Sequence, residues 1–195
     1  DMETPDIHKP FGYTTIRQTG NLNVMGFLAA SRQQLKARKA IINHQLGHNA
    51  VELIEAGVRV GENTANRIIF CEGYHGQTNP WFSYLPFAPT KGEVLTIRSN
   101  VQLQTIVNKR IFVLPLGNSL YRVGSTFDWR NINETPTDKG KQELLDQLDS
   151  FFKGSYEIVA HGAGIRPSVS DRKPLIGIHP QHRALALFNG LGTKG

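Results

Sequence analysis

The residues of this chain whose types and spacing best suggest chemistry lie in one run near its C-terminal end. Arg166 stands between Gly164 and Pro167, and Asp171 and Gly177 follow within a few residues. A guanidinium beside a rigid proline offers a forked pair of N–H donors, which suits a planar carboxylate better than a lysine would. This pattern predicts that Arg166 binds a carboxylate. The alternative is an ion pair inside the protein, for which Asp171 is a candidate.

A second run, at residues 189–195, reads Asn-Gly-Leu-Gly-Thr-Lys-Gly. Glycines let the backbone approach a bound molecule closely, because they carry no Cβ. The run is typical of a turn that binds a dinucleotide and continues into a helix, although a plain surface turn has a similar composition.

Two helices are expected to position these residues. Asn23 is a suitable N-cap for a helix over residues 24–39, whose apolar side includes Phe27, Leu28 and Leu35. Thr137 is a suitable N-cap for a helix that reaches about residue 152. The buried side of this second helix repeats at helical spacing and consists of Leu144, Leu145, Leu148, Phe151 and Phe152.

Short strands are expected around these helices, and they predict an α+β fold with a central mixed, largely antiparallel sheet and flanking helices. Gly117 and Asn118 form the turn of one hairpin. The apolar run 67–71 predicts a strand buried on both faces, with Cys71 as a small buried apolar residue. Residues 79–89 are expected to form an ordered loop. The expected strands are 13–17, 40–43, 50–54, 57–60, 67–71, 92–98, 104–107, 110–114, 119–125, 156–162 and 184–188.

Composition narrows the functional classes. The chain has 195 residues, 39% of them hydrophobic, and a net charge of +6, which predicts an ordered protein. Its densest basic cluster has the spacing of a solvated helix face, so nucleic-acid binding is not expected; it comprises Arg32, Lys36, Arg38 and Lys39. One cysteine excludes an internal disulfide, and no metal site is expected. No membrane span or signal peptide is visible, which predicts a cytoplasmic protein.

Taken together, the segments resemble flavoprotein oxidoreductases of the D-amino-acid oxidase and glycine oxidase type. Four motifs carry the resemblance in order. The first is a strand that ends in an acid and a glycine, at Glu72 and Gly73, and the second is a Leu-Pro-x-x-Pro-x-x-Gly-x-x-Leu run from Leu85 to Leu95. The third is a hairpin that contains Val113-Leu114-Pro115 and Val123-Gly124-Ser125-Thr126. The fourth is the Arg166 run from Gly164 to Gly177.

The resemblance implies FAD, bound without a covalent bond in the intact protein. The G-x-G-x-x-G turn that binds the ADP half of FAD in this family is absent from the chain, and so is the helix expected after residue 195. We therefore expect a fragment that is inactive alone and does not itself bind FAD. Residues 1–20 and 77–170 would form the substrate-binding domain, and residues 21–76 and 171–195 would be parts of the FAD domain.

The same resemblance implies roles for individual residues. Arg166 would pair with the substrate carboxylate over the flavin, and Phe112, Tyr121 and Phe127 would line the substrate pocket, although ordinary packing explains these three equally well. Phe112 stands where related oxidases often carry a tyrosine that orients the carboxylate. The residues implied near the flavin are Glu72, Gly73, Tyr74, Gly190, Leu191, Gly192, Thr193 and Lys194. His161, beside the Arg166 run, is expected to be structural.

The predicted function is oxidation of the C–N bond of a small carboxylate-bearing amine or amino acid, with hydride transfer to FAD and oxygen as the final acceptor. Two alternatives remain at this point. One is a flavin-dependent tRNA-modifying oxidase of the same fold, and the other is a non-enzymatic module that binds carboxylates around Arg166.

Overall fold

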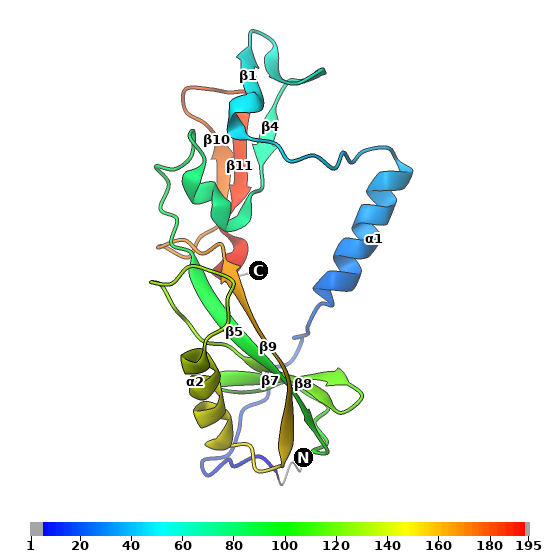
Figure 1. Cartoon of the computed structure of the whole chain (residues 1–195), viewed down its shortest axis with the longest axis vertical. Coiled ribbons are helices and arrows are strands. Elements are labelled where there is room, and N and C mark those ends of the chain that lie inside the picture. The colour runs from blue at the N-terminus through cyan, green and yellow to red at the C-terminus, as the bar shows by residue number, and fades with distance from the viewer. Residues whose placement is uncertain (1–5, 194–195) are drawn as a thin grey trace.

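Two separate hydrophobic cores organise the chain along its long axis (Figure 1). The structure is a computed structural model that describes residues 6–193. One core lies under a five-stranded sheet, and the other lies among two three-stranded sheets. Two long strands of the larger sheet, β5 (Thr90–Ser99) and β9 (Tyr156–Arg166), extend toward the smaller sheets (Figure 1).

The five-stranded sheet is antiparallel throughout, with the order β6-β7-β8-β5-β9. A hairpin joins β7 and β8 as predicted, but its two-residue turn is Asn118–Ser119, both at positive φ, and lies one residue later than expected because Gly117 still belongs to β7. The pairing of β5 with β9 runs from Thr90 opposite Arg166 to Ser99 opposite Tyr156. The strands are β5 (Thr90–Ser99), β6 (Val107–Lys109), β7 (Ile111–Gly117), β8 (Leu120–Gly124) and β9 (Tyr156–Arg166).

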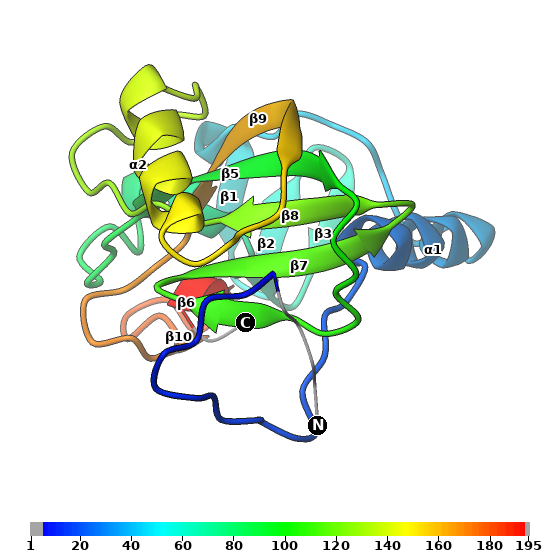
Figure 2. The ribbon, with the colours of Figure 1, turned by 90° about the horizontal axis from the view of Figure 1, so that it is seen from below.

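Helix α2 (Asp138–Asp149) covers one face of this sheet (Figure 2). The apolar side of the helix packs on the sheet, as its helical spacing predicts. It contacts alternate residues of each strand, because successive side chains of a strand point to opposite faces. Leu144, Leu148 and Phe151 are completely buried there against Leu95 and Val123. The opposite face of the sheet has no covering helix among the described residues.

The second core joins a hairpin sheet to a small mixed sheet. The hairpin sheet has the order β1-β2-β3, with β1 (Val51–Ile54), β2 (Gly57–Val60) and β3 (Asn63–Ala65). The mixed sheet has the order β10-β11-β4, with β10 (Leu175–Ile178), β11 (Leu185–Asn189) and β4 (Ile68–Phe70). β4 and β11 are parallel, whereas the other named strand pairs are antiparallel. The α+β class with a largely antiparallel sheet is therefore confirmed.

Helix α1 (Val24–Ala37) begins at Asn23, whose side chain accepts a hydrogen bond from the Gly26 amide at 3.0 Å. None of its residues is buried, and it stands apart from the three sheets (Figure 1). The apolar side of the helix, with Phe27, Leu28 and Leu35, therefore faces solvent in this chain. No helix among the described residues is long and apolar enough to cross a bilayer.

Several local predictions were wrong. Residues 13–17 and 40–43 form no strand. Cys71 is exposed, and Ile69 on β4 is 59% exposed, because β4 is an edge strand of a three-stranded sheet and covered on one side only. The strand expected at 104–107 is instead β6, at Val107–Lys109. Strands β3 and β10 were not predicted, since their short sequences lack apolar alternation.

The N-terminus of α2 yields a testable prediction. Thr137 Oγ1 accepts a hydrogen bond from the Gly140 amide at 3.0 Å and donates to the Glu93 carboxylate at 2.9 Å. Thr137→Ala removes both contacts and should lower the free energy of unfolding by about 1–2 kcal/mol. Thr137→Ser keeps the hydroxyl and should retain most of the stability in a denaturant titration. An equal loss in both variants would show that the methyl group matters instead.

Candidate functional site

Arg166 is the last residue of β9, and its side chain folds back over β5. A Cβ placed on Gly92 would lie 2.1 Å from the Arg166 Nη2 atom, so only glycine leaves room for the guanidinium there. The guanidinium donates to the Lys91 carbonyl at 3.5 Å, to the Thr126 carbonyl at 3.3 Å and to the Ser125 hydroxyl. The Phe127 ring packs on it, with 4.5 Å between Cζ and the ring centroid.

The guanidinium has no carboxylate partner among residues 6–193. Asp171, the candidate for an internal ion pair, instead accepts a hydrogen bond from the Lys173 amide at 3.0 Å. Partial burial lowers the pKa of Arg166, but an arginine stays protonated at neutral pH. A half-buried cation held only by neutral acceptors retains an unbalanced charge, and this favours an anionic ligand.

The sheet face opposite α2 carries two uncovered glycines near Arg166, Gly162 and Gly164. Phe112, Gly124, Val94 and Gly162 lie side by side in register across β7, β8, β5 and β9. No atom lies within 4 Å of where a Cβ would stand on Gly162 or Gly164. The glycines therefore leave a shallow floor beside the guanidinium that a flat molecule can approach.

Two of the three predicted pocket residues lie beside this floor. The Phe112 ring reaches toward Gly124, with its Cζ 3.2 Å from where a Cβ would stand, and Phe127 packs on Arg166. Tyr121 does not lie there, contrary to the prediction. It is 5% exposed in the core under α2, and its hydroxyl donates to the Val101 carbonyl. Strand alternation is the reason, because Tyr121 is an odd number of residues from Gly124.

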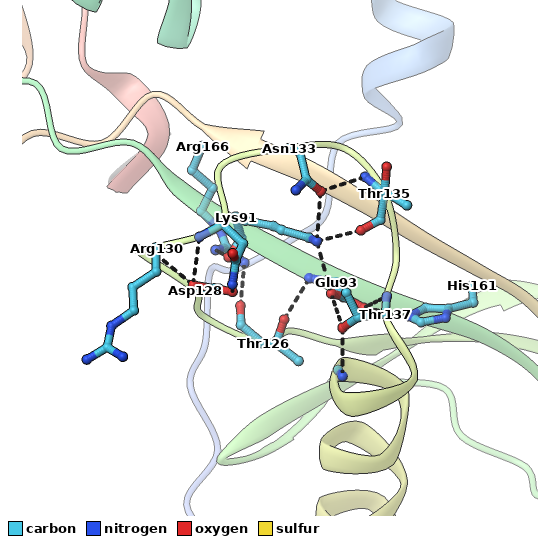
Figure 3. Close-up of polar contacts among 12 residues, drawn as sticks. Lys91, Glu93, Thr126, Asp128, Arg130, Asn133, Thr135, Thr137, His161 and Arg166 are labelled. Carbon is cyan, nitrogen blue, oxygen red and sulfur yellow. Dashed lines mark hydrogen bonds and ion pairs between the residues drawn. The ribbon is translucent and has the colours of Figure 1, made fainter.

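A buried polar network lies behind Arg166, on the α2 side of β5 (Figure 3). Lys91 Nζ and a Glu93 carboxylate oxygen are 3.4 Å apart, and both side chains are almost completely buried. Thr137 donates to Glu93 from its amide and its hydroxyl at 2.9 Å, and His161 Nε2 lies 2.8 Å from the same carboxylate. His161 is therefore part of this buried network.

Burial of the Glu93 carboxylate would raise its pKa, but hydrogen bonds outweigh burial and hold the pKa below its usual value of 4.5. The donors are Thr137, Lys91 and His161. Glu93 is therefore ionised at neutral pH, and its charge is balanced by Lys91.

The network also holds the loop between β8 and α2, at residues 125–137, which carries two of the three Arg166 acceptors, Ser125 and Thr126. Lys91 Nζ donates to Asn133 Oδ1 at 3.1 Å and to the Thr135 carbonyl at 2.5 Å. Lys91 and Asp128 exchange backbone hydrogen bonds of 2.9 and 3.0 Å. Hydrogen bonds from Asn131 and from the Arg130 amide lower the pKa of Asp128 to about 2, so this carboxylate stays ionised while it holds the turn.

The two glycine-rich stretches come together at the carboxyl ends of the parallel strands β4 and β11. Asn189 Nδ2 donates to the Gly73 carbonyl at 2.8 Å. Gly73 and Gly190 have φ values of +59° and +76°, which favour glycine. Ligands of open α/β sheets bind at such strand ends. The 3₁₀ helices η2 (Gly73–Thr78) and η3 (Leu191–Thr193) begin there.

These turns adjoin the Arg166 site. The Gly192 amide donates to the Pro167 carbonyl at 3.4 Å, and a Cβ on Gly192 would lie 2.7 Å from the Pro167 nitrogen. Gly192 therefore contacts Pro167, the residue that follows Arg166 in the sequence. The predicted neighbours Glu72 and Tyr74 flank Gly73, and Glu72 also binds His48 at 2.5 Å and Asn79 at 2.8 Å. Lys194 lies outside the described residues.

Residues 4–195 match the family model described as FAD dependent oxidoreductase, the DAO family. The chain belongs to this family. The arrangement fits a bound FAD, because close-approach glycines at two strand ends adjoin a glycine-floored face. FAD is accordingly the cofactor of the DAO-family protein that contains this chain.

Glycine oxidases and a related oxidase are among the proteins similar to this DAO-family chain. The chain is 32% identical over 113 residues to the glycine oxidase of Bacillus licheniformis, and this match covers 56% of the chain and 31% of that enzyme. The crystal structure of glycine oxidase from Geobacillus kaustophilus matches with a TM-score of 0.64 and 23% identity over 74% of the chain and 42% of that protein. That of iminodiacetate oxidase from Chelativorans sp. BNC1 matches with a TM-score of 0.70 and 22% identity over 86% and 49%. The chain thus spans half or less of the length of these relatives.

Lys91, Glu93 and Ser125 were not predicted as parts of the site. The signal for Lys91 and Glu93 was available, since a Lys-Gly-Glu triplet within an apolar strand places two charges on one face. Ser125 belongs to the Val123-Gly124-Ser125-Thr126 motif, but no role in the site was predicted for it. Sequence could not show that it contacts Arg166, because the two residues are 41 positions apart.

The low pKa of Glu93 yields a second prediction. Glu93→Gln removes the charge that balances Lys91, and should lower the free energy of unfolding at pH 7 by about 3 kcal/mol. Because the pKa in the folded state is lowered, the stabilisation is present above pH 4.5 and disappears as pH falls below it. The difference in the free energy of unfolding between wild type and variant, measured by denaturant titration, should become smaller below that pH. The exposed Glu134→Gln is the matched control and should show no such difference at either pH.

A third prediction tests the placement of Tyr121. Tyr121→Phe leaves the buried Val101 carbonyl without its donor and should lower the free energy of unfolding by about 1–2 kcal/mol. The KM for substrate should stay unchanged in the FAD-loaded protein, because the ring lies under α2. A raised KM with unchanged stability would place Tyr121 in the substrate pocket after all.

Proposed function

We propose that the intact protein oxidises the C–N bond of a small amine that carries a carboxylate, such as an amino acid or an N-substituted glycine. The observation that carries the proposal is the half-buried Arg166, which has no carboxylate partner among the described residues and lies beside a bare glycine floor. The similarity to glycine oxidases supports the same substrate class.

Arg166 would hold the substrate carboxylate through charge-assisted hydrogen bonds. The Lys91 and Thr126 carbonyls fix the guanidinium, and the Phe127 ring covers one side of it. A carboxylate held in this way orients the adjoining C–N bond over the glycine floor, and orientation of this kind supplies much of an enzyme's rate. FAD, when bound, accepts the hydride that leaves the substrate carbon.

The residues that would frame the cofactor are Glu72, Gly73, Tyr74 and the turn that begins at Gly190. Backbone N–H groups of this turn could approach the ring system closely, because glycine stands at its tight positions. FAD would be held without a covalent bond, oxygen would be the final electron acceptor, and this chain alone would be inactive. The domain division at residues 20, 77 and 170, the absence of nucleic-acid and membrane partners, and a cytoplasmic location stay predictions.

The first test uses the complete FAD-loaded protein that contains this chain. We expect hydrogen peroxide and an imine-derived carbonyl product from glycine, sarcosine or iminodiacetate, and no turnover of methylamine, which lacks a carboxylate. Binding of acetate without turnover of any amine would favour the non-enzymatic carboxylate-binding module. Absence of both acetate binding and turnover would contradict the proposal.

A fourth prediction concerns Arg166 itself. Arg166→Met should lower kcat/KM for the carboxylate-bearing amine by about 100-fold or more, because a charge pair at the substrate is lost. The matched control is Arg59→Met, which removes an exposed arginine of β2 that pairs with Glu52 at 3.2 Å. The control should keep wild-type kinetics. A wild-type kcat/KM in Arg166→Met as well would show that Arg166 does not bind the substrate.

A further inference from the structure

The Ser125 hydroxyl is the side-chain contact of Arg166 that can serve a ligand directly. Its oxygen accepts a hydrogen bond from the Arg166 Nη2 atom, and a hydroxyl that accepts a bond still has a proton to donate. No acceptor for this proton is present among the described residues. Ser125 is only partly buried, so its proton can reach a bound molecule.

The donors of Arg166 are partly used by the protein. The contacts to Ser125, to the Thr126 carbonyl and to the Lys91 carbonyl engage Nη1 and Nη2. They leave fewer N–H groups for a carboxylate than a free guanidinium would offer. A second donor beside Arg166 would compensate for this.

The neighbouring residues make Ser125 the natural second donor. Phe112 approaches the adjacent Gly124 with its Cζ and has no hydroxyl to offer. Phe127 covers the guanidinium with an apolar ring. The guanidinium that donates to the Ser125 oxygen also polarises its O–H bond and makes it a better donor.

We propose that Ser125 binds the substrate carboxylate directly, with its hydroxyl donating to one carboxylate oxygen while Arg166 donates to the other. This inference rests on the proposed function, and it adds a specificity-determining residue to it. The hydroxyl stays neutral and forms no covalent bond. The pair of donors selects planar anions that carry two oxygens on one carbon, and disfavours the corresponding amides, because a carboxamide nitrogen cannot accept a hydrogen bond.

The test measures binding of acetate to the complete FAD-loaded protein by isothermal titration calorimetry, together with KM and kcat for the amine substrate. Ser125→Ala should raise the Kd of acetate and the KM by about tenfold or more, with a smaller change in kcat, because a hydrogen bond to a charged group is lost. Ser125→Thr keeps the hydroxyl and should stay within about threefold of wild type. Ser125→Cys, close in size but a weak donor, should behave like Ser125→Ala, and replaces it if that variant fails to fold.

A double-mutant cycle separates direct binding from an effect through Arg166. In an Arg166→Lys background, Ser125→Ala should still weaken acetate binding if the hydroxyl touches the carboxylate. If Ser125 only positions Arg166, the weakening should disappear in that background, and the proposal is overturned. Unchanged acetate binding in Ser125→Ala overturns it as well. Failure of the wild type to bind acetate or oxidise any carboxylate-bearing amine would instead refute the proposed function.

Discussion

The buried ion pair between Lys91 and Glu93 supports the rest of this site. Two charges taken out of water are costly unless each finds further partners. Here the partners are the amide and hydroxyl of Thr137, His161, Asn133 and the Thr135 carbonyl (Figure 3). The pair thus ties the start of α2 and the preceding loop to β5, and the two ends of this loop cannot move independently of the sheet.

Strand β5 therefore contributes residues to both faces of the sheet. Lys91 and Glu93 point toward α2, and Gly92 between them lies under the Arg166 guanidinium. The same loop that Lys91 holds supplies the Thr126 carbonyl, the Ser125 hydroxyl and the Phe127 ring. The buried network and the Arg166 guanidinium lie on opposite sides of a single strand, so the position of the guanidinium depends on the network.

The meeting of the two glycine turns follows from the topology of the small mixed sheet. β4 and β11 are the parallel pair among the named strands, and they end at the two glycine turns that the Asn189–Gly73 hydrogen bond joins. The contact of Gly192 with Pro167 then brings these turns beside Arg166. The two glycine turns and Arg166, which come from distant parts of the sequence, thus meet at one place.

The sequence by itself determined the elements with strong local signals and the family. Thr137 and Asn23 cap helices as predicted, the hairpin formed within one residue of its predicted turn, and the order of four motifs indicated a DAO-type flavoprotein. Only the tertiary structure decided which face each strand residue occupies. It places Tyr121 in the core and Cys71 at the surface, and Asp171 accepts a hydrogen bond from Lys173 instead of pairing with Arg166. Capping and turn formation depend on neighbours a few residues away, whereas burial and pairing depend on segments that meet only after folding.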